Sequence, residues 1–85
     1  MEQVPRIRSV KPLPNKHLEI EFENGEHKDY DCNPILKRPE FFLLKDDGFF
    51  KCARVDSGGY GISWNDDIDI SEYEAWTQGV EMVSQ

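Results

Sequence analysis

Residues 17–23 read His-Leu-Glu-Ile-Glu-Phe-Glu, and this alternation of apolar and acidic residues constrains the fold more than any other stretch. Successive side chains of a strand point to opposite faces of a sheet, so the three apolar residues of this run share one face. The pair Asn24-Gly25 follows at once, and both residue types tolerate the positive φ angles of a tight turn. The sequence therefore predicts a hairpin whose second strand covers residues 26–32.

The two strands of this hairpin have two candidate registers. A two-residue loop at Asn24-Gly25 would set the apolar face of one strand against the polar face of the next, which is unfavourable. A three-residue loop over residues 23–25, with Gly25 left-handed in a bulge, aligns the apolar faces and adds Tyr30 to them. We expect this second register. Its pairs are Phe22 with Glu26, Glu21 with His27, Ile20 with Lys28, Glu19 with Asp29, Leu18 with Tyr30, and His17 with Asp31.

The other face of the hairpin is expected to be acidic. His17 and His27 fall on this face, each opposite a carboxylate, while Glu19 directly opposite Asp29 is a repulsive pair that costs about 0.5 kcal/mol. The carboxylates form what we call the acidic ladder, which consists of Glu19, Glu21, Glu23, Asp29 and Asp31.

Residues 6–13 precede the hairpin and place apolar residues three apart in a proline-rich stretch. Because proline within sheets is confined to edges and bulges, this segment is expected to be an edge strand with a bulge. Its basic residues are then placed to neutralise the neighbouring acidic face. They are Arg6, Arg8 and Lys11.

The second half of the chain contains helix and hairpin signals. Asn33-Pro34 predicts a helix cap, residues 39–45 a second helical turn or two, and residues 46–48 a breaker. Residues 49–55 and 60–64 predict a second hairpin. The sequence Ser71-Glu72-Tyr73-Glu74 matches a capping box, and Tyr73, Trp76, Val80 and Val83 continue at helical spacing, so a C-terminal helix is expected to cover the sheet.

These signals together predict an α+β fold in a single domain over residues 1–85. We expect a small antiparallel β-sheet of five strands in the order β-β-β-α-β-β-α, with a short middle helix and a C-terminal helix packed on it. The predicted core includes Leu18, Ile20, Phe22, Tyr30, Phe42 and Trp76.

Several segments, taken in order, resemble those of a known family. They are Ile7-Arg8-Ser9-Val10-Lys11-Pro12-Leu13, the run from Leu18 to Glu26, the Tyr30-Asp31 pair, and Ile62-Ser63-Trp64-Asn65 leading to Asp69-Ile70. On these the chain resembles the small bacterial domain of unknown function 2442 family. The resemblance implies a compact α+β domain, sometimes fused to a helix-turn-helix segment and often encoded beside a second small protein in a toxin–antitoxin-like pair. It implies no catalytic or ligand-binding residues, and we expect no DNA-binding segment after the C-terminal helix.

The charge balance narrows the class of partner. Against 10 Lys and Arg stand 17 Asp and Glu, a formal net charge of −7, so nucleic acid is an unfavourable partner. The longest aliphatic and aromatic run, residues 41–44, is far too short to cross a membrane. Two cysteines without Cys-x-x-Cys spacing predict reduced thiols in a cytoplasmic protein.

The residues carry no recognisable catalytic or metal-binding motif. The carboxylates lie at alternating or turn positions open to water, where acid–base catalysis is inefficient, so we expect no enzyme activity. The stretch 65–69 lacks the glycine and glutamate of a calcium loop, and the glycine-rich stretch 57–61 opens no helix that could bind phosphate. We expect no cofactor and no metal. A zinc site would need donors from opposite strand faces: His17, His27, Cys32 and Cys52.

The remaining class is a binding protein. The predicted partner is a basic protein, in keeping with the electrostatic steering that acidic surfaces provide. One alternative is a homo-oligomer, such as a dimer formed through an exposed sheet edge, with no dedicated basic partner. A small metal-binding protein is a further alternative. The candidate partner-binding residues are Glu19, Glu21, Asp29 and Asp31.

Overall fold

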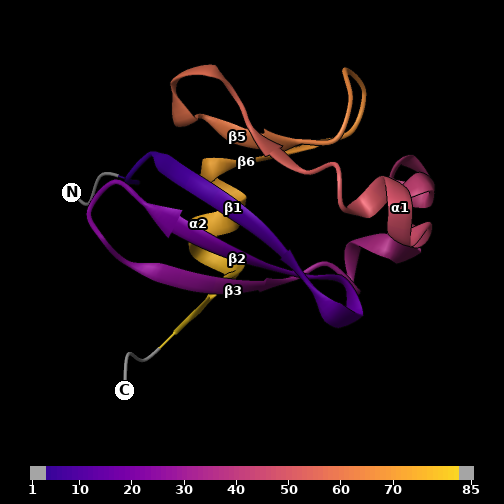
Figure 1. The fold of residues 1–85 in the computed structure, drawn as a ribbon, viewed down its shortest axis with the longest axis horizontal. Helices are drawn as coiled ribbons and strands as arrows, with labels where there is room; N and C mark the ends of the chain where they lie inside the picture. The colour runs from indigo at the N-terminus through magenta and orange to yellow at the C-terminus, as the bar shows by residue number, and fades with distance from the viewer. Residues whose placement is uncertain (1–3, 83–85) are drawn as a thin grey trace.

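The strands of the protein form two antiparallel sheets (Figure 1). The computed structural model describes residues 4–82. The larger sheet has the strand order β1-β2-β3-β7 and the smaller one β4-β5-β6. The α+β class with antiparallel pairing is confirmed, but the prediction of one five-stranded sheet is wrong. The strand bounds are β1 Ile7–Leu13, β2 His17–Phe22, β3 His27–Asp31, β4 Arg54–Val55, β5 Gly61–Ser63, β6 Asp69–Ser71 and β7 Val80–Glu81.

The hairpin of β2 and β3 has the predicted register. Glu19 is the Cα partner of Asp29, and the other four pairs between these strands also agree with the three-residue loop. Gly25 has a φ of 91°, and its N–H donates to the Phe22 carbonyl at 2.9 Å. The Phe22 N–H donates in turn to the Glu26 carbonyl at 2.8 Å, which closes the loop.

Strand β1 is an edge strand with a bulge, as predicted. The register between β1 and β2 shifts between Ile7 and Ser9, so Arg8 is the extra residue on the bulged strand. Such a residue is released from strict alternation. This freedom lets Arg8 reach across to β2, as described below.

Short helices make up most of the connections between strands, where η denotes a 3₁₀ helix. Three of them lie between the two sheets: η2 (Ile35–Lys37), η3 (Pro39–Lys45) and α1 (Asp47–Phe50). Within the sheets, η1 (Pro14–Lys16) links β1 to β2 and η4 (Ser57–Gly59) links β4 to β5. The Asn33 side chain does not cap η2. It donates to the Asn15 carbonyl at 2.9 Å and to the Asp31 carboxylate at 2.8 Å, so that prediction is wrong.

Residues 46–48 follow the end of η3 at Lys45, as predicted, and they also begin α1, which was not predicted. The Asp46 carboxylate accepts from the Phe49 N–H at 2.9 Å, which is the N-cap interaction. Phe49 and Phe50 are therefore helical, and the predicted strand over residues 49–55 is reduced to β4. The β4–β5 hairpin itself is present.

Phe42 is 63% exposed, so its predicted place in the core is wrong. In a 3₁₀ helix residues three apart lie on one face. Phe41 and Leu44 therefore point inward together and are buried, which leaves Phe42 on the outside.

Helix α2 (Glu72–Gln78) lies behind the larger sheet in Figure 1. Its Trp76 ring meets Phe22 edge to face at 5.0 Å between centroids, as expected for core packing. Leu18, Ile20, Phe22 and Tyr30 are buried on this inner face of the sheet, as predicted.

Only half of the predicted capping box forms. The Ser71 hydroxyl accepts from the Glu74 N–H at 3.0 Å. The Glu74 carboxylate, however, accepts from the Tyr30 hydroxyl at 2.7 Å and thereby ties β3 to α2.

Helix α2 is shorter than its apolar spacing predicted. Gly79 is extended (φ −72°, ψ 151°), and Val80 with Glu81 then pairs with β3 as strand β7. A Cβ at Gly79 would lie 2.6 Å from the Ala75 carbonyl oxygen and 3.0 Å from the Lys28 Cβ. The close approach of α2 to β3 therefore favours glycine there. The predicted helical position Val83 lies outside the described residues.

Candidate docking face

The side of the larger sheet opposite α2 carries six polar side chains, among them all four predicted partner-binding residues. We call these six side chains the outer face, and their exposed fractions range from 27% to 49%. Strand alternation places them there, because their neighbours along β2 and β3 point inward to the core. The outer face consists of His17, Glu19, Glu21, His27, Asp29 and Asp31.

His17 lies between two carboxylates of β3. Its Nδ1 is 2.7 Å from Asp29 Oδ1, and its Nε2 is 3.5 Å from Asp31 Oδ1. The predicted attraction between His17 and Asp31, its Cα partner, is thus present, but the shorter contact is the diagonal one to Asp29.

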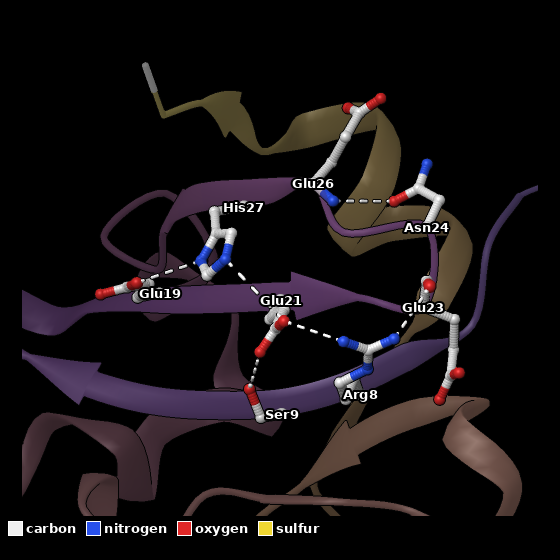
Figure 2. Close-up of polar contacts among 8 residues, drawn as sticks. All are labelled: Arg8, Ser9, Glu19, Glu21, Glu23, Asn24, Glu26 and His27. Atoms are coloured by element: carbon white, nitrogen blue, oxygen red, sulfur yellow. Dashed lines mark hydrogen bonds and ion pairs between the residues drawn. The ribbon is translucent and has the colours of Figure 1, made fainter. Parts of the chain in front are cut away.

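His27 of β3 likewise lies between two carboxylates of β2 (Figure 2). Its Nδ1 is 3.3 Å from Glu19 Oε2, and its Nε2 is 3.9 Å from Glu21 Oε2. Glu19 and Asp29 face each other as predicted, yet each has an imidazole on its diagonal. The sequence predicts both histidines on this face. Their diagonal contacts were not predicted, because they depend on side-chain rotamers.

The bulged strand β1 supplies cationic and polar contacts to Glu21. The Arg8 guanidinium donates to Glu21 Oε2 at 3.1 Å and to the Glu23 carbonyl at 3.1 Å, while the Ser9 hydroxyl donates to Glu21 Oε1 at 3.3 Å (Figure 2). The predicted neutralisation from β1 is therefore confirmed for Arg8. Arg6 instead lies over the Tyr60 ring, 4.4 Å from its centroid.

These contacts shift the protonation equilibria of the outer face. The hydrogen bond with Asp29 raises the pKa of His17 above its usual value, outweighing partial burial, and Asp31 adds to the effect. The pKa of Asp31 is lowered, chiefly because its carboxylate accepts from the Asn33 backbone N–H, and His17 adds a smaller contribution. Both shifts favour the charged forms.

The outer face does not gather its donors around one point. Asp29 and Asp31 meet different ring nitrogens of His17, so the three groups do not share a centre. Cys32, on the buried side, has a thiol whose pKa burial raises to about 12, and Cys52 is exposed in the segment after α1. Among residues 4–82 no group of three or more His, Cys, Asp or Glu side chains is arranged to hold a metal ion.

A groove beside the outer face was not predicted. Its volume is about 500 Å³, and it forms because β7 adds an aliphatic border to β3. Val80 is 69% exposed and lies opposite Asp29. Strand β7 was not predicted because Val80 continues the helical spacing of Tyr73 and Trp76. The groove is lined by His17, Asp29, Asp31, Val80, Glu81 and Met82.

The remaining polar stretches form a turn and a link between strands, as predicted. The Asn65 side-chain oxygen accepts from the backbone N–H groups of Asp67 and Ile68, both at 2.8 Å, which makes residues 65–68 a polar turn before β6. The glycine-rich stretch links β4 to β5, and a Cβ at Gly59 would lie 2.6 Å from the Ile7 carbonyl oxygen. No helix within residues 4–82 is long and apolar enough to cross a membrane.

Comparison with known proteins gives one match. The model of a protein family of unknown function, DUF2442, matches residues 7–73. No curated protein and no solved structure matches the chain. The matched range includes β1, β2 and β3, and hence the whole outer face. The chain belongs to the DUF2442 family.

Proposed function

We propose that this protein is a small non-enzymatic binding protein, an antitoxin-like or adaptor partner of another small bacterial protein in the cytoplasm. Its outer face docks a basic surface of that partner. One observation supports this above the others: four carboxylates share one side of a sheet whose opposite side packs against α2. The family resemblance adds the expectation of a neighbouring small protein.

Electrostatics makes a basic partner the best fit. The chain has a formal net charge of −7, and complementary charge accelerates encounter and excludes partners of like charge. The carboxylates of the outer face are between 27% and 49% exposed, so they are reachable without unfolding. Their contacts with Arg8 and the histidines hold them in defined positions, which reduces the entropy lost on docking.

The experiment is a capture from native lysate with three forms of the tagged protein. The first is the wild type, and the second carries Glu19→Gln with Asp29→Asn. The third carries Asp66→Asn with Asp67→Asn in the turn between β5 and β6, which removes the same charge away from the outer face. A partner retained by the wild type and the turn variant, but lost from the outer-face variant, supports the proposal.

Salt provides the second criterion. Exposed charges are screened over about 8 to 10 Å at physiological ionic strength, so the captured partner should elute as salt rises. A partner that binds all three forms equally and ignores salt would assign the acidic ladder to solubility.

A homo-oligomer is the second candidate function. The observation that favours it is β7, a two-residue strand at the border of the larger sheet with Val80 exposed. Exposed edges can pair with a second chain. Size-exclusion chromatography with light scattering on the wild type and Val80→Lys measures this directly, since a dimer through β7 would dissociate in the variant.

A further inference from the structure

We propose that the outer face is a pH gate: acidification that protonates His17, the imidazole that lies between two carboxylates of β3, releases the basic partner that the face binds at higher pH. This inference rests on the proposed function and adds the regulation of the same site. It is carried by the geometry of the His17 imidazole.

Both histidines of the chain lie on the outer face, and each contacts two carboxylates through different ring nitrogens. An imidazole that meets carboxylates on both sides is best satisfied when both nitrogens carry protons, because each can then donate. A protonated His17 therefore places a positive charge in the middle of the surface that a basic partner approaches. Histidine is the side chain whose charge changes between about pH 5 and 8.

The charges facing His17 come from all its neighbouring elements. Asp29 and Asp31 come from β3, Glu19 follows on β2 itself, and Glu81 of β7 lines the adjoining groove. From β1, Lys11 is the Cα partner of Glu19.

The charges facing His27 come from two strands. Glu19 and Glu21 of β2 contact its ring, and Arg8 of β1 binds the same Glu21. Strand β7 reaches His27 only through the backbone, where the Met82 N–H donates to the His27 carbonyl at 2.9 Å.

Protonation then removes most of the negative charge of this surface. With neutral imidazoles, the four carboxylates of the outer face and Glu81, set against Arg8 and Lys11, leave a formal charge of −3. An imidazolium at His17 changes it to −2. A surface with two thirds of the charge binds a polycation more weakly, and the loss is local to the docking residues.

Acidification should raise the stability of the fold while it lowers the affinity for the partner. The His17 imidazolium gains two carboxylate contacts, including that to Asp29, which otherwise repels Glu19 across the strands. The folded state is then held more firmly at pH 6 than at pH 8. Weaker binding together with undiminished stability distinguishes the gate from acid unfolding.

The test uses a tetramethylrhodamine-labelled octa-lysine peptide, whose lysines and dye keep their charge over this range, and fluorescence anisotropy at pH 8 and pH 5.5 at equal ionic strength. The wild type should lose roughly twofold to fivefold in affinity between these pH values, since a single surface charge contributes a modest amount. His17→Gln with His27→Gln keeps polar side chains but no titration, so its affinity should be equal at the two pH values.

Two further variants separate the inference from the proposed function. At pH 8, Glu19→Gln with Asp29→Asn should bind the peptide more weakly than Asp66→Asn with Asp67→Asn. If these two bind alike, the peptide does not use the outer face, and both the function and the gate are wrong. If they differ but wild-type affinity is independent of pH, the docking face stands and the gate alone is overturned.

A measurement without any ligand completes the test. The His17 ring proton, followed by NMR, should titrate above its usual pKa of 6.5 in the wild type, and Asp29→Asn should lower that pKa. A wild-type titration at or below 6.5 means that the imidazole is not held between carboxylates, and this overturns the gate.

Discussion

Gly25 decides which side chains of the hairpin face the core. Its φ of 91° is in the left-handed region, and no atom lies within 4 Å of a Cβ built on it. Any effect of a substitution there is therefore backbone strain and not a steric clash. This separation makes Gly25 a clean probe of the three-residue loop.

We expect Gly25→Ala to lower the free energy of unfolding by about 1 to 2 kcal/mol, the cost of a left-handed conformation for an L-residue. Urea unfolding followed by tryptophan fluorescence measures this difference. Gly48→Ala is the matched control. Gly48 lies in α1 without a positive φ, and its Cβ would meet only Asp46 Oδ2 at 3.4 Å. Equal stability of the two variants would contradict the loop geometry.

Acidification from about pH 8 to pH 6 should stabilise the folded protein through His17. The pKa of His17 is raised on folding, first by the hydrogen bond with Asp29. A raised folded-state pKa gives stability that is fully present below the unfolded-state pKa of 6.5 and is lost as pH rises through the folded-state pKa. Urea midpoints at the two pH values should therefore rise on acidification in the wild type, and rise less in His17→Gln. A variant that gains as much as the wild type would rule out this linkage.

Individual elements differ in how well the sequence predicts them. The β2–β3 hairpin was predicted in register because strict alternation and an Asn-Gly turn agree with each other. Strands β6 and β7 were not predicted, because segments of three and two residues carry no measurable period. Their strand conformation comes from pairing with β5 and β3.

Misassigned helical segments have local physical causes. Asp46 was interpreted as part of a breaker that ends a helix. Aspartate favours turns but also caps helices, and here the Asp46 carboxylate accepts from the Phe49 N–H at the start of α1. Phe42 was predicted to lie in the core. The tighter 3₁₀ turn rotates it outward.

The candidate docking face was predicted in part for similar reasons. Alternation alone puts Glu19, Glu21, Asp29 and Asp31 on one side of the sheet, so these positions follow from the sequence. The diagonal contacts of the histidines depend on side-chain rotamers. The border formed by β7 depends on the pairing of β7 with β3. Neither has a signature in a single sequence.

One polar link between β3 and α2 is the Tyr30 hydroxyl, which donates to the Glu74 carboxylate at 2.7 Å, and another is the Lys28 ammonium, which donates to the Trp76 carbonyl at 2.6 Å. We expect Tyr30→Phe to lower the free energy of unfolding by about 1 to 3 kcal/mol, because this bond has a charged acceptor and is partly buried. Tyr73→Phe is the control, since Tyr73 lies on α2 and is exposed. Thermal unfolding of both variants measures the contrast. A Tyr30→Phe protein as stable as Tyr73→Phe would mean that this hydrogen bond adds nothing to the stability of the fold.

Charge is unevenly spread over the molecule as a whole. Residues 56–85 contain seven acidic residues and no lysine or arginine, whereas the outer face has Arg8 and two histidines among its carboxylates. Long-range attraction of a cation depends on the sum of these charges. Retention after contact depends on the residues touched.

This distinction predicts different kinetics for the two charge variants. Glu19→Gln with Asp29→Asn and Asp66→Asn with Asp67→Asn remove equal charge, so both should slow association of the octa-lysine peptide by a similar factor. Only the outer-face variant should also dissociate faster, by roughly threefold to tenfold. Stopped-flow anisotropy at about 20 mM and 150 mM NaCl gives both rates. Faster dissociation from the turn variant would move the binding surface to the β5–β6 turn.

The chain leaves strand β7 at Met82, and Met82 itself lines the groove that borders the outer face. Any segment joined there by a short flexible linker begins at the rim of the candidate docking face, where its effective concentration is on the order of millimolar. A basic extension would thus occupy the carboxylates in cis ahead of a separate partner of micromolar affinity. An uncharged extension avoids this competition, so the charge of a C-terminal fusion determines whether the face is free or self-occupied.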